Sequence, residues 1–387
     1  MEEEILNRII SNYNTPAYVF DINKAKERVQ YLRDKLPPNI LLCYAIKANT
    51  FIVKELEQII DRFEVCSPGE YEICKKKNIN PEKILISGVY KTPEVIKQMI
   101  FEDKDIGCYS IESMEQFELL KKLSENDKIK VMIRITSGNQ FGINEIEAEE
   151  IIKNRMQYSN IEIVGIQYFS GTQKNSLKIL KKEIEYIDMF IEKLYNEYAF
   201  ETKELEFGPG LPVYYFQNNE FDEESFMKEF SEILKQINFK GKLILELGRS
   251  IAASCGKYIT KVVDKKSNKN QNYAILDGGI HHLVYYGQSM AMKIPKCEVY
   301  PKRKNVNEER WNLCGSLCTI NDILVKQFPV SNLQIGDIFV FENTGAYCMT
   351  EGASLFLSRE LPEIIKIKEN KELELTRENI PTYKLNM

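Results

Sequence analysis

Short apolar runs rich in β-branched residues alternate with longer amphipathic stretches up to about residue 250. The longer stretches, such as 52–60 and 176–195, space their apolar residues as helices do. We expect strands at 41–47, 63–66, 84–87, 106–109, 131–135, 163–169, 205–207 and 243–247. Eight strands that alternate with helices predict a (β/α)8 barrel, in which the chemistry lies at the carboxyl ends of the strands.

The pattern changes beyond about residue 250, where strand-like runs follow one another with few helices between them. These runs are 258–263, 273–276, 323–328, 338–342 and 364–375, and the polar stretch 265–272 is typical of an exposed hairpin loop. A further run at 18–20 precedes the first barrel helix and is expected to pair with this second domain. We therefore predict a barrel domain at 22–250 and a C-terminal β domain at 251–387 that also takes up residues 1–21.

Composition narrows the classes of function. The 387 residues are 43% hydrophobic and 28% charged, with a net charge of −5, and charges of both signs are interspersed. We therefore expect neither a nucleic-acid surface nor a membrane partner. The acidic start lacks the pattern of a signal peptide, and nine scattered cysteines predict reduced thiols and a cytoplasmic protein. The two histidines, His281 and His282, are adjacent; on a strand they would point to opposite faces, so no metal site is expected.

A lysine stands at the end of the first predicted barrel strand, in the sequence Tyr44-Ala45-Ile46-Lys47-Ala48-Asn49. An ammonium group is rarely buried among apolar and small residues. Desolvation lowers the pKa of an amine, and the neutral amine can condense with an aldehyde. The alternative is an ordinary solvated lysine at a strand end.

Two later strand ends carry further polar candidates. Gly208 and Gly210 follow the seventh strand, where glycines and a helix start can bind a phosphate group, although a plain turn has the same sequence. Glu246 ends the eighth strand, and the alternation of side chains turns it into the barrel. Its carboxylate suits a pyridinium N–H and Arg249 suits a phosphate, whereas an ordinary ion pair between the two residues is the alternative.

The β domain contributes two more candidates. The thiol of Cys318 can donate or accept a proton near neutral pH. The hydroxyl of Tyr347 can bind a phosphate group. Both residue types are also common in protein cores, so neither residue is decisive alone.

Together these segments resemble the fold-type III pyridoxal-phosphate decarboxylases, the group of ornithine, arginine and diaminopimelate decarboxylases. The likeness covers nearly the whole chain, in the family's order. It rests on Tyr44-Ala45-Ile46-Lys47-Ala48-Asn49, Glu64-Val65-Cys66-Ser67-Pro68-Gly69-Glu70, Gly171-Thr172-Gln173, Gly208-Pro209-Gly210, Glu246-Leu247-Gly248-Arg249, Asp277-Gly278-Gly279, Cys318 and Gly345-Ala346-Tyr347. One such motif is weak, but eight in order are highly specific.

The resemblance implies an alanine racemase-like fold, with a barrel followed by a β-sandwich or barrel-like domain, and pyridoxal 5′-phosphate as the cofactor. It implies that Lys47 holds the cofactor covalently and that Glu246 pairs with the pyridinium nitrogen. The residues implied for the phosphate are Gly208, Gly210, Gly248, Arg249 and Tyr347, with Thr172 close by. The residues implied around the lysine and the ring are Glu64, Glu70 and Arg134.

The implied reaction is loss of the α-carboxylate of an amino acid, because a protonated ring accepts the electrons that remain. Alanine racemases place an arginine opposite the ring nitrogen, so Glu246 argues against racemisation. Cys318 is implied to come from a partner subunit and to protonate the product. A homodimer with shared active sites is therefore implied.

Three departures from the family pattern bear on the substrate. Phe169 stands where the family usually has a histidine stacked on the cofactor, and an aromatic face can still stack there. Thr319 replaces the acidic residue that binds a distal ammonium in diamine-forming members. The residues after Asp277 contain His281 but lack the arginine of diaminopimelate decarboxylases. We place Asp277, His281 and Thr319 at the substrate, although a structural role for His281 stays open.

These departures look most like a side branch that includes the glutamyl-carrier-protein decarboxylase of butirosin biosynthesis, in secondary metabolism. The leading hypothesis is a decarboxylase of an aminoacyl group, such as glutamyl, tethered to a carrier protein. One alternative is a free amino acid such as diaminopimelate, lysine or ornithine. Another is a non-catalytic regulator or cofactor-binding homologue, but such proteins have lost the lysine or the β domain.

Overall fold

The computed structural model describes residues 2–103, 105–124, 127–218, 221–303 and 308–387. Contacts within the chain divide it into two compact units. The barrel unit consists of Arg28–Val213 and Asp222–Ile251, and the β unit of Met1–Glu27, Tyr214–Phe221 and Ala252–Met387.

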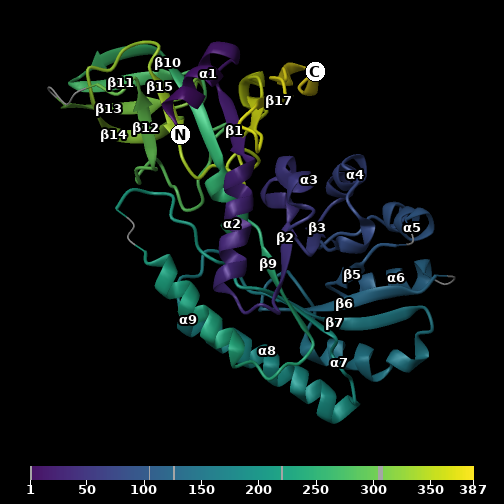
Figure 1. The fold of residues 1–387 in the computed structure, drawn as a ribbon. Helices are drawn as coiled ribbons and strands as arrows, with labels where there is room; N and C mark the ends of the chain where they lie inside the picture. Colours follow the sequence, from purple (N-terminus) through teal and green to yellow (C-terminus); the bar gives the residue numbers. More distant parts are fainter. Residues whose placement is uncertain (1, 104, 125–126, 219–220, 304–307) are drawn as a thin grey trace. The chain divides into compact units, whose positions relative to one another are not determined.

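The barrel unit contains a closed parallel barrel, in which each strand is hydrogen-bonded to the next and β9 to β2 (Figure 1). The strands are β2 (Leu41–Ala45), β3 (Arg62–Val65), β4 (Ile84–Ile86), β5 (Cys108–Ile111), β6 (Ile129–Ile135), β7 (Ile161–Phe169), β8 (Glu204–Gly208) and β9 (Lys242–Leu247). Their residues are buried almost throughout, as expected for a parallel sheet covered on both faces. The predicted eight-stranded barrel is confirmed.

Helices alternate with these strands. They are α2 (Ile22–Lys35), α3 (Val53–Leu56), α4 (Pro68–Lys76), α5 (Pro93–Glu102), α6 (Met114–Leu123), α7 (Glu145–Lys153), α8 (Leu177–Tyr198), α9 (Glu223–Lys235) and α10 (Arg249–Ala252). The longest, α8, buries one stripe that includes Leu180, Ile184 and Ile187, at the spacing of an amphipathic helix. The helix predicted at 52–60 is shorter than expected, because Lys83 donates to the carbonyl oxygens of Glu57 and Ile60 and so holds this segment outside the helix.

The β unit is a nine-stranded mixed sheet with helix α1 (Glu3–Asn12). The strands are β1 (Ala17–Asp21), β10 (Gly256–Asn268), β11 (Gln271–Leu276), β12 (Cys297–Tyr300), β13 (Glu308–Cys314), β14 (Ile323–Ser331), β15 (Ile338–Phe341), β16 (Glu363–Ile367) and β17 (Leu373–Arg377). Strand β1 lies between β10, to which it is antiparallel, and β16, to which it is parallel. The strand order is β14-β13-β11-β10-β1-β16-β17, and β15 joins β12 to β10. A barrel with a separate β domain is the predicted fold class.

Several sequence-based assignments in the β unit were wrong. Strands β12 and β13 were not predicted, and the run 364–375 is a hairpin of β16 and β17. Most of the polar stretch 265–272 belongs to the paired ends of β10 and β11, with the turn confined to Lys269 and Asn270, which both have positive φ. Charged side chains suit these strands because the hairpin is exposed on both faces.

The division into units also differs from the predicted boundaries at residues 22 and 250. The segment 214–221 falls within the β unit because Phe216 forms a bridge with Pro295, and the Gln217 amide donates to the Ile294 carbonyl at 2.8 Å. The start of α2 falls there too, since Lys26 forms an ion pair with Glu369.

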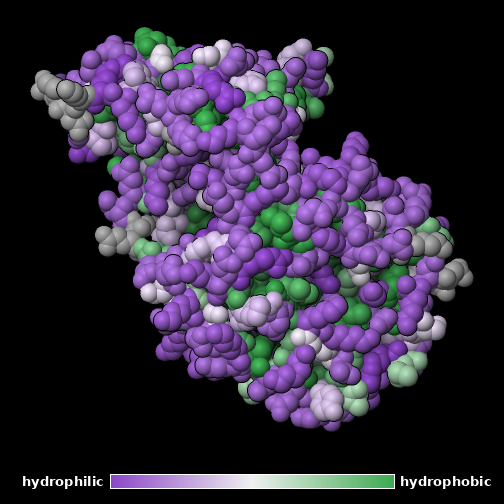
Figure 2. Space-filling model, viewed as in Figure 1, coloured by the Kyte–Doolittle hydropathy of each residue, from purple (hydrophilic) through white to green (hydrophobic). Residues whose placement is uncertain are grey.

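Hydrophilic residues cover most of the face seen in Figure 2, and hydrophobic residues show in the gaps between them. Within the described residues no helix is both long and apolar enough to cross a membrane. Each of the nine cysteines is a free thiol.

Candidate active site

Lys47 lies in a 3-10 turn (Ile46–Ala48) directly after β2, at the carboxyl end of the barrel strand. Its Nζ atom is 2.7 Å from Oε2 of Glu64 and 3.5 Å from the sulfur of Cys66. The lysine side chain is 40% exposed, whereas that of Glu64 is 1% exposed. The prediction of a desolvated lysine was therefore wrong: the turn carries Lys47 out of the strand and into an ion pair at the barrel mouth.

Two buried carboxyl groups near Lys47 have opposite electrostatic environments. Burial disfavours the charged form of Glu64, but the ammonium of Lys47 and the guanidinium of Arg134 outweigh it, and the pKa of Glu64 falls. Burial and then repulsion by Glu64 raise the pKa of Glu246. The strand alternation that placed Glu246 inside the barrel was therefore a sound guide: Glu246 is buried, and the positive charge of Lys47 partly offsets the rise in its pKa.

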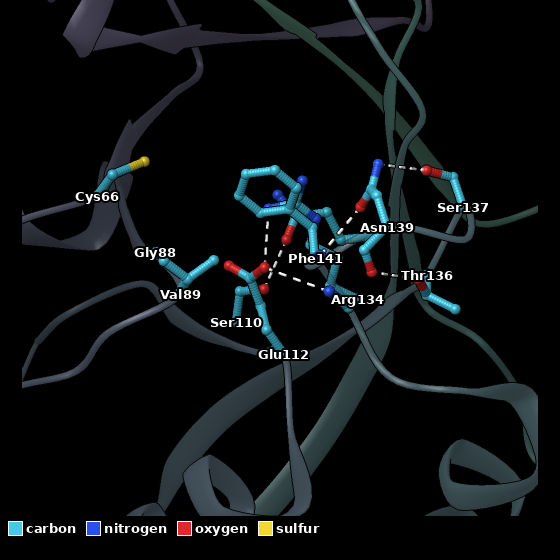
Figure 3. A network of polar contacts seen from close by, with 12 residues as sticks. Cys66, Gly88, Val89, Ser110, Glu112, Arg134, Thr136, Ser137, Asn139 and Phe141 are labelled. Carbon is cyan, nitrogen blue, oxygen red and sulfur yellow. Dashed lines mark hydrogen bonds and ion pairs between the residues drawn. The ribbon is translucent and has the colours of Figure 1, made fainter.

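Arg134 and Glu112 form a second buried pair beside this one. The Nη1 atom of Arg134 donates to Oε2 of Glu112 at 3.1 Å, and the guanidinium carbon lies 4.8 Å from the ring centre of Phe141 (Figure 3). Oε1 of Glu112 and Nε of Arg134 are buried and have no hydrogen-bond partner among the described residues. Such orphaned polar atoms are unusual in protein interiors and are common where a ligand binds. Glu112 was missed in the sequence, although it directly follows a barrel strand.

Two glycines allow the loops after β7 and β8 to pack closely. A Cβ atom on Gly208 would lie 2.1 Å from the ring of Phe169, and one on Gly210, whose φ is +58°, would lie 2.2 Å from the carbonyl oxygen of Gly171. The same contact brings the backbone of Thr172 to Gly210. The carboxyl ends of β7 and β8 and the loops that follow place Phe169, Thr172 and the two glycines at one end of the barrel, and their role in binding a phosphate group stays a prediction.

The helix expected to follow this glycine turn is absent there. Within the described residues 211–218 no helix forms, and the next helix, α9, begins at Glu223; prolines at 209 and 212 disfavour a helix directly after the glycine turn. The helix that directly follows a barrel strand is α10: Gly248 accepts a hydrogen bond from the Ile251 amide at 3.1 Å, and the buried Arg249 is the first residue of the helix.

Glu70, in helix α4, was predicted beside the lysine. Its Oε2 atom accepts a hydrogen bond from the backbone amide of Cys66 at 2.7 Å. Burial is the main cause of its raised pKa. Ser67 caps α4 by accepting from the Glu70 amide, so the local sequence fixes the glutamate against the loop that carries Cys66.

A buried polar chain inside the barrel was not predicted. Arg62 donates to Glu206 at 3.0 Å, Gln167 lies between Glu206 and Glu246, and Ser110 donates to Oε1 of Gln167 at 2.5 Å. Burial raises the pKa of Glu206 although Arg62 opposes the shift. The only signal in the sequence was the placement of Glu206 and Gln167 at inward positions of their strands.

In the β unit, Cys318 is exposed on a loop between β13 and β14. The carboxylate of Asp322 holds this loop by accepting from the amides of Ile280 at 2.8 Å and Leu317 at 2.7 Å. Thr319 is partly exposed on the same loop. Tyr347 has a φ of +64°, an uncommon conformation for a bulky residue that marks a constrained position.

Asp277 and His281, which were predicted to lie at the substrate, are surrounded by other residues of the β unit. Asp277 accepts hydrogen bonds from Thr15, Thr260 and the Lys261 amide, so its carboxylate anchors neighbouring segments of the β unit. His281 lies in a turn and is 1% exposed, with its ring centre 3.7 Å from that of His282. Its contact with substrate stays a prediction. The adjacent rings show that the expectation of opposite faces, which assumed a strand, was wrong.

A closed (β/α)8 barrel that carries a lysine and buried carboxylates at its mouth, together with a mixed-sheet unit, defines a barrel enzyme of the fold-type III class. Residues 22–253 match the family model described as "Pyridoxal-dependent decarboxylase, pyridoxal binding domain", which spans more than half of the chain. The chain therefore belongs to the pyridoxal-dependent decarboxylase family. The expected cofactor, pyridoxal 5′-phosphate, and the expected class of enzyme, a decarboxylase, are both supported.

The chain is similar to a diaminopimelate decarboxylase of Aquifex aeolicus, with 28% identity over 97% of this chain and 92% of that protein. It is also similar to the L-glutamyl-[BtrI acyl-carrier protein] decarboxylase of Niallia circulans, with 26% identity over 97% of this chain and 94% of that protein. The crystal structure of diaminopimelate decarboxylase from Helicobacter pylori complexed with L-lysine matches with a TM-score of 0.83, at 22% identity and 98% coverage of both chains. This last likeness supports the fold alone.

The barrel residues fit the cofactor of the family. One barrel carries, at its mouth or in its interior, an amine and a buried acid that can share a proton. It also carries two closely packed glycine loops and the orphaned polar atoms of Glu112 and Arg134. This donor set matches the aldehyde, the ring nitrogen and the phosphate that pyridoxal 5′-phosphate presents.

Proposed function

We propose that Lys47 binds pyridoxal 5′-phosphate and that the loaded protein removes the α-carboxylate of an aminoacyl substrate. The observation that carries the proposal is the ion pair of 2.7 Å between Lys47 and the buried Glu64, at the mouth of a barrel that also buries Glu246. An amine and an acid in this arrangement serve the two reactive ends of one cofactor, its aldehyde and its ring nitrogen. Lys47→Ala tests the assignment: the visible absorption of the bound cofactor should disappear, and an unchanged band would refute it.

The cofactor, when bound, supplies an electron-withdrawing ring that stabilises negative charge at the substrate α carbon. Glu246 keeps a proton at the ring nitrogen, because its carboxylate accepts a hydrogen bond there. Glu64, 2.7 Å from the amine of Lys47, would hold this amine as an ammonium group whenever it is free of the cofactor. The residues that would bind the phosphate group are Gly208, Gly210, Thr172, Gly248, Arg249 and Tyr347. Phe169 would offer its aromatic face to the ring, and Glu70 and Arg134 would support the lysine and the ring.

The thiol of Cys318 would donate a proton to the α carbon in place of the CO2 that leaves. Its exposed loop position leaves the thiol accessible to a substrate or to another subunit. We propose a homodimer in which Cys318 serves the barrel of the partner. Mixing Lys47→Ala protein with Cys318→Ala protein tests this, because a mixed dimer contains one intact site. Recovered activity supports sharing, and persistent inactivity of mixed dimers, verified by two affinity tags, contradicts it.

For the substrate we propose an aminoacyl group of glutamyl type tethered to a carrier protein. Thr319 offers no charge to a distal ammonium, and its hydroxyl accepts a hydrogen bond from the Asn321 amide at 3.3 Å. The glutamyl-carrier-protein decarboxylase of Niallia circulans is one relative that supports this choice. A free amino acid, diaminopimelate above all, is the second candidate, since several relatives carry that name.

The substrate test compares free lysine, ornithine, diaminopimelate and glutamate with glutamyl-loaded carrier protein at equal concentrations, with release of CO2 as the readout. We expect kcat/KM for the tethered group to exceed that for every free amino acid. Fast turnover of free diaminopimelate would remove the tethered substrate and leave the second candidate. Thr319→Glu adds a sharper arm: it should improve turnover of free diamino acids, because it restores an acidic partner at that position.

A further inference from the structure

Gln167 is a fully buried amide near the carboxyl end of β7. Ser110, which Figure 3 shows beside Glu112, donates its hydroxyl to Oε1 of Gln167 at 2.5 Å. The Nε2 atom therefore faces two carboxyl groups, with Oε2 of Glu246 at 3.2 Å and Oε1 of Glu206 at 3.5 Å. A flipped amide would turn its oxygen toward both carboxyl groups, so ionised carboxylates at Glu246 and Glu206 favour this orientation.

The two carboxyl groups that Gln167 bridges are held differently. Glu206 has a cation at 3.0 Å, the guanidinium of Arg62, which also binds Glu204 at 2.6 Å. Glu246 instead accepts a neutral N–H from Gln167. Because an amide NH2 group has two donors, Gln167 can serve both acids at once and keep them apart.

We propose that Gln167 is a positioning residue for Glu246: its amide holds Oε2 and favours the ionised carboxyl, which leaves Oε1 to receive the ring nitrogen of the cofactor. The inference rests on the proposed role of Glu246. Ser110 acts one step further back, because it sets the orientation of the amide. The expected consequence of the hydrogen bond is a ring nitrogen that stays protonated through the reaction.

Other charged groups also act on Glu246 and must be held constant. Glu64 on β3 and Glu206 on β8 oppose its ionisation, whereas Lys47 and Arg134 favour it. The thiols of Cys43 and Cys66 lie within electrostatic reach as well. A substitution at Gln167 replaces none of these charged side chains, so its effect reports the hydrogen bonds that the amide donates to Glu246 and Glu206.

The test uses Gln167→Met, which keeps the length of the side chain and removes both donors. The holoenzyme is loaded with cofactor labelled with ¹⁵N at the ring nitrogen, and the ¹⁵N resonance is recorded across the pH range of stability. In the native protein we expect the protonated ring. In the variant the resonance should move toward the unprotonated position, kcat should fall about 10- to 100-fold, and KM should change by less than about 3-fold.

Two further variants complete the design. Ser110→Ala keeps Gln167 but frees its amide to rotate, so it should shift the resonance in the same direction by a smaller amount; it also serves if Gln167→Met does not fold. Gln116→Met removes a similarly buried amide, which binds Lys91 at 3.1 Å and the Val89 carbonyl at 3.0 Å, and should leave the resonance unmoved.

The outcomes separate the inference from the function on which it rests. A native-like resonance in both Gln167→Met and Ser110→Ala overturns the positioning role, as does an equal shift in Gln116→Met. If Glu246→Gln itself leaves the ring protonated, the proposed role of Glu246 fails and the inference falls with it. If the native protein does not take up the cofactor, the proposed function fails.

Discussion

Replacing Arg62 by methionine should destabilise the barrel unit, because the change leaves a carboxylate in the barrel interior without its cation. Arg62 opens β3 and binds Glu204 at 2.6 Å and Glu206 at 3.0 Å. The Glu204 side chain is 16% exposed and has Lys242 at 3.8 Å, whereas that of Glu206 is fully buried. The cost therefore arises mainly at Glu206. Removal of one partner of a buried ion pair costs about 3–5 kcal/mol, so we expect a loss of this size in the free energy of unfolding near neutral pH.

The loss should grow with pH. Burial outweighs Arg62 and raises the pKa of Glu206 above its ordinary 4.5 in the folded protein. The folded state then holds this proton more tightly than the unfolded state, so stability falls as pH rises from the unfolded pKa toward the folded pKa. Without Arg62 the folded pKa rises further. The gap between the native protein and the variant should therefore widen as pH rises from the folded pKa of Glu206 in the native protein toward its higher folded pKa in the variant, and should be constant below that range.

Urea denaturation followed by far-UV circular dichroism, repeated between about pH 5 and 8, measures this gap. Arg62→Met combined with Glu206→Leu should recover most of the loss, because both charges are then absent. The control is Lys203→Met, which breaks an exposed pair of 2.7 Å with Glu162 and should cost less than about 1 kcal/mol. A loss below 1 kcal/mol for Arg62→Met, or one that is the same at every pH, would refute the reasoning.

Three further predictions concern the site. Lys47→Arg keeps a cation for Glu64 but cannot bind the cofactor covalently, so its visible absorption band and its CO2 release should both be lost; a retained band would contradict the role of the amine. Gly210→Ala should raise the cofactor Kd by about tenfold, since its Cβ would lie 2.2 Å from the Gly171 oxygen, whereas Gly138→Ala, also at positive φ but in open space, should leave the Kd unchanged. Burial lowers the pKa of His281 to about 3, so its ring proton resonance should stay constant down to about pH 5; a midpoint near 6.5 would show an accessible ring.

The sequence located every barrel strand to within a few residues, because parallel strands covered on both faces form continuous apolar runs that end in turns. It also placed Glu246 correctly inside the barrel, since alternation along a strand is a local rule. The exposure of Lys47 was not predictable in this way, because it depends on a single 3-10 turn after β2.

The polar contacts in the barrel interior could not be predicted from single strands. Arg62, Gln167 and Glu206 come from β3, β7 and β8, and their contacts depend on how far each strand is shifted along its neighbours in the closed barrel. Strand β13, likewise, begins with three charged residues, Glu308, Glu309 and Arg310, and resembles a loop until its partners β11 and β14 are known.

Strand β1 has hydrogen-bonded neighbours on both sides, β10 and β16, and both are synthesised after the whole barrel. During translation its backbone amides and carbonyls therefore lack these two strand partners until the C-terminal part of the chain leaves the ribosome. An apolar segment with open edges is a site for wrong association in that interval. Chaperone protection of the nascent chain should accordingly matter most for this short segment rather than for the barrel, whose strands find their neighbours in the order in which they emerge.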